Sequence, residues 1–216
     1  MQSRARRTLA FLLIAMATGA AGRGAAQSRA DDDAWKTRLP AQLHIGTQAS
    51  VAAQFEIACR DGKGGALGWS LIIAQPDAMN AFPLDDFEGP GGIGEKRVLA
   101  QWSVGDGSSD GVARTSISGW YGVDGDGFVL ATSQLTAKPA DLARLSRALI
   151  ASAGGMMHLV VQPPEGKGDA LNADAQIGDH REAIARILEP CLPPAKRPAA
   201  ASVQIRSKQD DQAGRE

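Results

Sequence analysis

The residues of this chain that could carry out chemistry are few and far apart in the sequence. His44, His158 and His180 are the only histidines, and they have neither the spacing of metal ligands nor a third ligand type nearby. We therefore interpret them as structural or exposed residues and expect no metal site. Because no nucleophile, base and acid converge in the sequence, we also expect no catalytic residues and no cofactor.

Two glycine-rich segments match known motifs without the elements that those motifs need. Gly107-Ser108-Ser109-Asp110-Gly111 fits the nucleophile elbow, but a strand and not a helix is expected after it. Gly89-Pro90-Gly91-Gly92-Ile93-Gly94 fits the dinucleotide fingerprint, but acidic loop residues precede it and a strand is expected to follow. Both are interpreted as turns. Ser109 and Asp86 are kept as the residues that a hydrolase would use.

A possible binding surface is predicted around Trp120 and Tyr121. Successive side chains of a strand point to opposite faces of the sheet. The two rings should therefore lie on opposite faces, and one of them should be exposed. Asp124 and Asp126 follow in a tight turn and add carboxylate oxygens, which could hold calcium weakly. Asp and Gly are also common in tight turns for backbone reasons alone.

The two cysteines predict a disulfide between Cys59, on a predicted strand, and Cys191, at the end of a predicted helix. The prediction depends on export, because disulfides persist in oxidising compartments. Residues 1–26 have the organisation of a signal peptide, with Arg4, Arg6 and Arg7 before an apolar stretch and small residues before a cleavage point after Ala26. We therefore predict a periplasmic or secreted protein.

Composition divides the rest of the chain into three parts. Residues 27–34 are expected to be a flexible mature N-terminus, residues 35–192 a single domain, and residues 193–216 a disordered tail. No apolar run is long enough to span a bilayer, so no integral membrane segment is expected after cleavage. Removing residues 1–26 takes four arginines from the 23 basic residues and none of the 24 acidic ones, which leaves a net charge of −5. This charge argues against nucleic acid as a partner.

The elements that must position these residues are mainly strands. Alternating apolar residues predict strands over residues 51–59, 67–73, 98–104, 112–121 and 128–135, and later over 156–162 and 171–177. Helical spacing predicts helices over residues 139–153 and 179–191. The predicted fold class is α+β: mainly an antiparallel meander, with two helices packed on one side and one disulfide.

Part of this plan resembles a known family. A strand ending in Phe55-Glu56-Ile57-Ala58-Cys59, a second strand Leu67-Gly68-Trp69-Ser70-Leu71, and a last strand that turns through Gly178 into a helix ending at Cys191 are similar to small exported bacterial proteins of the VasI-like kind, associated with type VI secretion. The resemblance implies the compartment and the architecture. It carries over no functional residues.

The sequence thus leads to three hypotheses of function. The first is a non-catalytic binding or accessory domain whose partner is a protein or a cell-envelope component. The second is a cell-envelope hydrolase. The third is a calcium-dependent surface protein.

Overall fold

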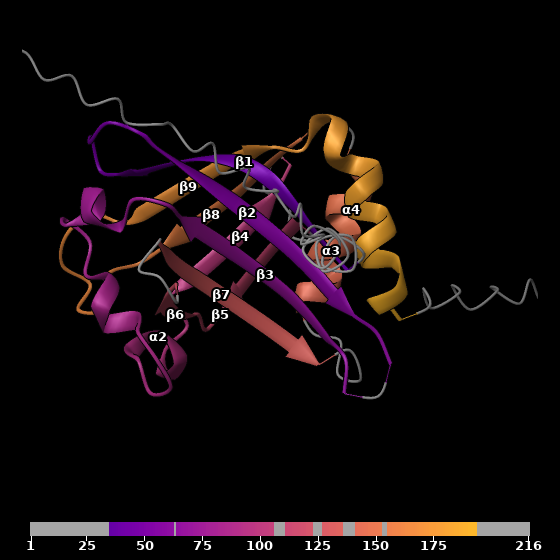
Figure 1. Cartoon of the computed structure of the whole chain (residues 1–216), viewed down its shortest axis with the longest axis horizontal. Helices are drawn as coiled ribbons and strands as arrows, with labels where there is room; N and C mark the ends of the chain where they lie inside the picture. The colour runs from indigo at the N-terminus through magenta and orange to yellow at the C-terminus, as the bar shows by residue number, and fades with distance from the viewer. Residues whose placement is uncertain are drawn as a thin grey trace, which may run out of the picture.

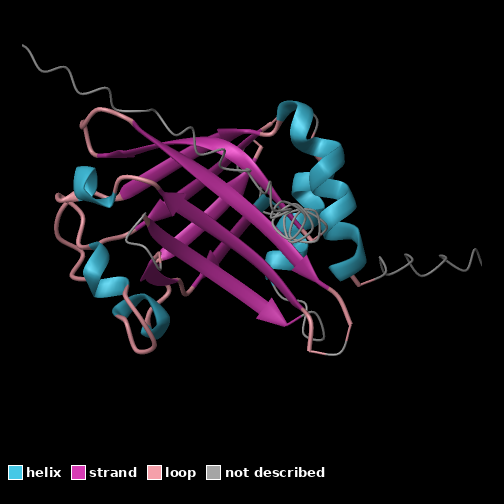
Figure 2. Ribbon diagram, in the orientation of Figure 1, coloured by secondary structure: helices cyan, strands magenta, loops and turns pink. Residues whose placement is uncertain are grey.

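The protein is built around one antiparallel sheet that curls into a half-barrel (Figures 1 and 2). The computed structural model describes residues 35–62, 64–105, 111–122, 127–135, 141–152 and 155–193. Within these residues the strands are β1 (Lys36–Ile45), β2 (Val51–Arg60), β3 (Ala66–Ile73), β4 (Ala100–Val104), β5 (Val112–Thr115), β6 (Ser118–Tyr121), β7 (Phe128–Leu135), β8 (Met156–Val161) and β9 (Leu171–Gln176). The helices are η1 (Pro76–Met79), η2 (Leu84–Phe87), α2 (Ile93–Lys96), α3 (Asp141–Ala151), η4 (Gly178–His180), α4 (Arg181–Leu188) and η5 (Glu189–Cys191).

The order of the strands explains why the sheet curls. It runs β5-β4-β8-β9-β1-β2-β3-β7-β6, and every pair of neighbours is antiparallel. β5 and β6 thus lie at opposite edges of the sheet, although only Ser116 and Ile117 separate them in the chain. The two edges can be this close only if the sheet bends around on itself.

The prediction of one continuous strand over residues 112–121 is therefore wrong. The segment breaks at Ser116 and Ile117 into β5, which pairs with β4, and β6, which pairs with β7. Ile117 is buried at the break, and its N–H donates to the carbonyl oxygen of Gly94 at 3.0 Å. The predicted hairpin of residues 51–59 and 67–73 is confirmed as β2 and β3.

β1 is a central strand that the sequence analysis missed. Leu39, Ala41, Leu43 and Ile45 alternate into the core, but Pro40 lies among them, and proline is disfavoured inside sheets because it has no N–H to donate. Pro40 pairs with Gln54 of β2 and lies beyond the last residue of β1 that pairs with β9. The absence of an N–H at Pro40 therefore need not remove any hydrogen bond between strands.

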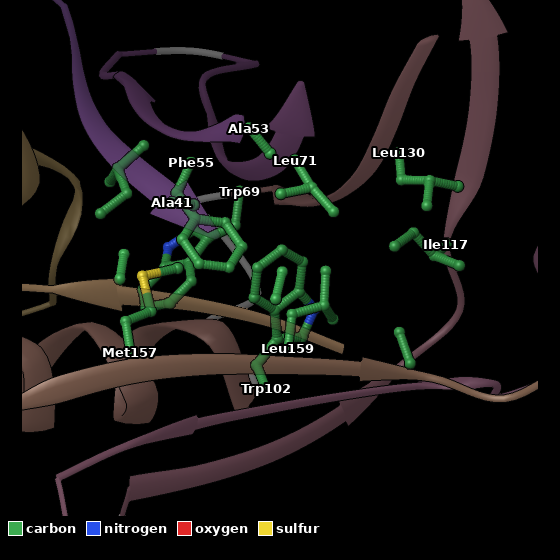
Figure 3. Close-up of a cluster of buried hydrophobic side chains, with 14 of the residues drawn as sticks. Ala41, Ala53, Phe55, Trp69, Leu71, Trp102, Ile117, Leu130, Met157 and Leu159 are labelled. Carbon is green, nitrogen blue, oxygen red and sulfur yellow. The ribbon is translucent and has the colours of Figure 1, made fainter. Parts of the chain in front are cut away.

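The core fills the inside of the curl. Figure 3 shows Phe55, Trp69 and Trp102 turned toward one another, with the ring centre of Trp102 5.8 Å from that of Phe55 and 5.6 Å from that of Trp69. Trp102 Nε1 donates to Thr115 Oγ1 at 3.2 Å, so its polar atom is satisfied in the core. The prediction that Trp69 and Trp102 are core residues is confirmed.

The two longer helices lie next to each other at one end of the curled sheet (Figure 1). α3 packs against β3, β4 and β5, while α4 packs against β1 and β2. The prediction of an antiparallel sheet with one disulfide is confirmed, but that of two helices on one side is met only in part. The predicted meander is wrong, because β3 pairs with β7 and β4 pairs with β8 instead of with each other. Because the sheet curls, the two helices pack on strands from different parts of it, and η1, η2 and α2 lie at the other end.

The disulfide joins Cys59, near the end of β2, to Cys191 in η5, as predicted. It fixes the segment that follows α4 to the sheet. No helix of the described residues is long and apolar enough to cross a membrane. The predicted signal peptide, the mature N-terminus of residues 27–34 and nearly all of the predicted tail lie outside the described residues, so those predictions stay predictions.

Candidate functional site

Trp120 and Tyr121 both lie on the surface at the edge of the sheet. Trp120 is 46% exposed and Tyr121 is 39% exposed, whereas the alternation of a strand predicted that only one ring would be. Trp120 stands opposite Val129 of β7. Tyr121 is the last residue of β6, and its ring packs edge-on against Phe128 with ring centres 4.8 Å apart. Tyr121 thus keeps the strand alternation on the face of Phe128, and both rings are exposed because β6 is an edge strand.

Tyr121 is held in place by the acidic segment that contains η2. Its hydroxyl donates to Asp85 Oδ1 at 2.5 Å. This hydrogen bond, partial burial of the ring, and repulsion from the carboxylates of Asp85, Glu88 and Asp77 raise the pKa of Tyr121 to about 12. Among the described residues none of the three carboxylates forms an ion pair. We call Trp120, Tyr121, Asp85 and Glu88 the aromatic-acidic surface.

The acidic segment is fixed to β6 by its backbone and by one buried ring. Glu88 forms a parallel bridge with Gly119, and the N–H of Gly89 donates to the Gly119 carbonyl oxygen at 2.9 Å. Phe87 is fully buried beneath them and stacks on Phe82 with ring centres 5.5 Å apart. These contacts hold the acidic segment, and with it Asp85 and Glu88, in a fixed position beside β6.

Several predicted site residues are placed differently, or lie outside the described residues. Ser109, Asp124 and Asp126 fall outside them, so the predictions for the elbow segment and for the possible calcium turn stay predictions. Asp86 is exposed in η2, and no described residue forms a hydrogen bond or ion pair with its side chain. The segment Gly89–Gly94 follows η2 and runs into the single turn of α2, and the strand expected after it is present as β4. Among the described residues η2, and not the strand that a dinucleotide site needs, precedes the segment.

A second polar site lies on the outer face of the sheet, and the sequence analysis missed it. Side chains from four strands surround an open depression of about 440 Å³. We call it the polar depression; its polar side chains are His44, Ser103, His158, Asn172 and Asp174. His158 Nδ1 lies 2.5 Å from Asp174 Oδ1, which is a direct hydrogen bond.

The histidines are therefore less scattered than the sequence suggested. His44 and His158 line the same depression, while His180 ends η4 elsewhere. No three His, Cys, Asp or Glu side chains of the described residues are grouped so that they could hold a metal ion. The side chains of the polar depression can donate and accept hydrogen bonds. One clue was present in the sequence, because its polar residues occupy the outward positions of alternating strands.

No family model, curated protein or solved structure matches this chain. The fold itself defines the class to which the protein can be assigned: a curled antiparallel half-barrel with two helices at one end and one disulfide. The resemblance to VasI-like proteins stays a prediction.

Proposed function

We propose that this protein is an exported binding domain that contacts a protein or a cell-envelope component through its aromatic-acidic surface. The observation that carries the proposal is the exposed Tyr121 beside carboxylates that no described residue neutralises, with a second exposed ring, Trp120, next to it in the same edge strand. Export is supported by the predicted signal peptide and by the Cys59–Cys191 disulfide, which suits an oxidising compartment.

Exposed aromatic side chains suit binding for two physical reasons. Trp and Tyr bury a large area when they are covered, and they are enriched among the residues that dominate binding energy. Tyr121 is already fixed by Phe128 and Asp85, so little side-chain freedom is lost on association. This preorganisation favours a binding role over a purely structural one.

The charge of the surface indicates the chemistry of the partner. Asp85 and Glu88 make the potential around Tyr121 negative, as the raised pKa of Tyr121 reflects. A partner with Lys or Arg side chains would be attracted to the carboxylates and could place a cation over the Trp120 ring. We therefore propose a partner that presents a basic segment.

Crosslinking of the mature protein in the envelope fraction of its native host tests this proposal. Trp120→Ala should weaken capture of a recurrent partner about thirty-fold, since loss of a dominant aromatic contact costs about 2 kcal/mol. A higher salt concentration should also weaken capture of the partner, because salt screens the attraction between the carboxylates and a basic segment. Val98→Ala is the matched control, because Val98 is a 63% exposed apolar residue outside this surface.

Two outcomes would contradict the binding proposal. One is that no partner is recovered under mild crosslinking. The other is that Trp120→Ala and Val98→Ala recover the same partner equally well. Thermal unfolding of both variants shows whether each is folded.

A further inference from the structure

Three residues of the polar depression stand in one row across adjacent strands. Ser103 of β4 lies directly opposite His158 of β8, and His158 lies directly opposite Asp174 of β9. Residues paired in this way across antiparallel strands have Cβ atoms about 5 Å apart. All three side chains occupy the outward-facing positions of their strands. The register of the sheet therefore aligns a hydroxyl, an imidazole and a carboxylate.

The hydrogen bond to Asp174 determines which nitrogen of His158 is available as a base. Asp174 Oδ1 accepts from His158 Nδ1 at 2.5 Å, so the neutral ring carries its proton on Nδ1. Nε2 is then the proton acceptor, on the far side of the ring from Nδ1. The side chains of His158 and Asp174 are 37% and 35% exposed, so a small molecule can reach them. This is how a carboxylate orients a general base in nucleophilic catalysis.

Two further side chains of the polar depression can bind a carbonyl oxygen. Asn172 Nδ2 donates one hydrogen bond to the Ala170 carbonyl at 3.0 Å and keeps a second N–H. His44 lies directly opposite Asn172. The backbone N–H groups of these strands pair within the sheet, so stabilisation of an oxyanion would fall to these side chains. Such support suits esters with good leaving groups better than amides.

We propose that Ser103, His158 and Asp174 form a hydrolytic site for small esters in the polar depression. Ser103 Oγ attacks the ester carbonyl carbon while its proton passes to His158 Nε2. The bond to the alcohol oxygen then breaks, and the alcohol leaves with that proton. Water hydrolyses the acyl-serine in the same way, with His158 as base and Ser103 Oγ as leaving group. Asp174 is the positioning residue.

Ser103 Oγ and His158 are not hydrogen-bonded to each other in this structure. Contacts between nucleophile and base are often long in unliganded enzymes and shorten when substrate binds. Rotation about the Cα–Cβ bond of Ser103 moves its oxygen toward or away from the paired His158. The contact can therefore form without a change in the backbone.

A fluorophosphonate probe tests the proposal directly, because it labels only an activated serine. Mass spectrometry of the mature wild-type protein should locate the label on Ser103. Ser103→Ala should lose the label, and Asp174→Asn should lower the labelling rate about 10²-fold or more. Ser133→Ala is the matched control, because Ser133 lies on the outer face of β7, away from the depression. It should be labelled like the wild type.

Hydrolysis of p-nitrophenyl acetate gives a second readout. The wild type should release an initial burst of nitrophenol as the acyl-serine accumulates, and Ser103→Ala should release none. Failure to label Ser103, or equal labelling of wild type and His158→Gln, would overturn the proposal. Neither outcome bears on the aromatic-acidic surface, which the crosslinking experiment tests separately.

Discussion

At the scale of single residues, Tyr121 offers a direct measurement of the aromatic-acidic surface. It is the only tyrosine of the chain, so the absorbance of tyrosinate reports this residue alone. We expect a titration midpoint of about 12 in the native protein and about 10 in denaturant. Because the pKa is higher in the folded state, the stabilisation is complete below pH about 10 and is lost as the pH rises through about 12.

The hydrogen bond to Asp85 is the largest cause of this pKa shift, and the neighbouring Asp86 provides the control. Asp85→Ala removes both the hydrogen bond and the nearest negative charge, so the native midpoint should fall toward 10. Asp86→Ala should leave the midpoint nearly unchanged, since Asp86 makes no contact with Tyr121 among the described residues. A wild-type midpoint near 10, or equal shifts in the two variants, would contradict this description of the surface.

Predictions for single residues were right where the alternation of one strand or the presence of just two cysteines was sufficient to make them. The burial of Trp69 and Trp102 and the pairing of Cys59 with Cys191 all followed from alternation and export. The exposure of both Trp120 and Tyr121 did not, because it depends on the position of β6 at the edge of the curled sheet. The row of Ser103, His158 and Asp174 could not be found from sequence either, since it depends on the pairing of β4 with β8.

At the scale of elements, Gly119 determines how closely the acidic segment packs on β6. A Cβ atom at Gly119 would lie 2.4 Å from Phe128 Cζ and 3.3 Å from Phe87 Cβ. Gly119→Ala must therefore displace buried rings, and we expect it to destabilise the fold by about 1 to 3 kcal/mol. Denaturant unfolding of the variant measures this loss.

A second strand glycine provides the comparison. Gly68 lies on the outer face of β3, where an added Cβ would meet its nearest atoms at 3.8 and 4.0 Å, which is ordinary contact. Gly68→Ala should be neutral or slightly stabilising, because glycine weakens the interior of a strand. If Gly68→Ala and Gly119→Ala lower the unfolding midpoint equally, close packing at β6 is not the cause.

Element-level predictions were right for strands with regular alternation and wrong where tertiary contacts changed a strand. β2, β3 and β7 were predicted because their apolar residues recur at every second position. β1 was missed because of Pro40, which the sheet tolerates only since β9 does not pair there. The break between β5 and β6 is invisible in the local sequence, because it is the curl of the whole sheet that requires it.

At the scale of the whole molecule, the disulfide closes most of the fold into one loop. Cys59 and Cys191 are 132 residues apart, and β3 to β9 with α3 and α4 lie between them. Such a loop restricts the unfolded chain strongly, and the chain-entropy model assigns it about 5 kcal/mol. This is comparable with the whole stability of many domains. We therefore expect the folded state to be much more stable with the disulfide formed than with both cysteines reduced.

The double variant Cys59→Ala/Cys191→Ala tests this without leaving a reactive thiol. We expect its free energy of unfolding to fall by up to about 5 kcal/mol, and wild-type protein in reductant should lose a similar amount. Because both sulfur atoms are in the core, part of the loss is local packing of η5 on β2. Comparing the variant with reduced wild type separates the two, since reduction keeps the buried sulfur atoms. A loss under about 1 kcal/mol in both would mean that the core alone holds the curled sheet closed.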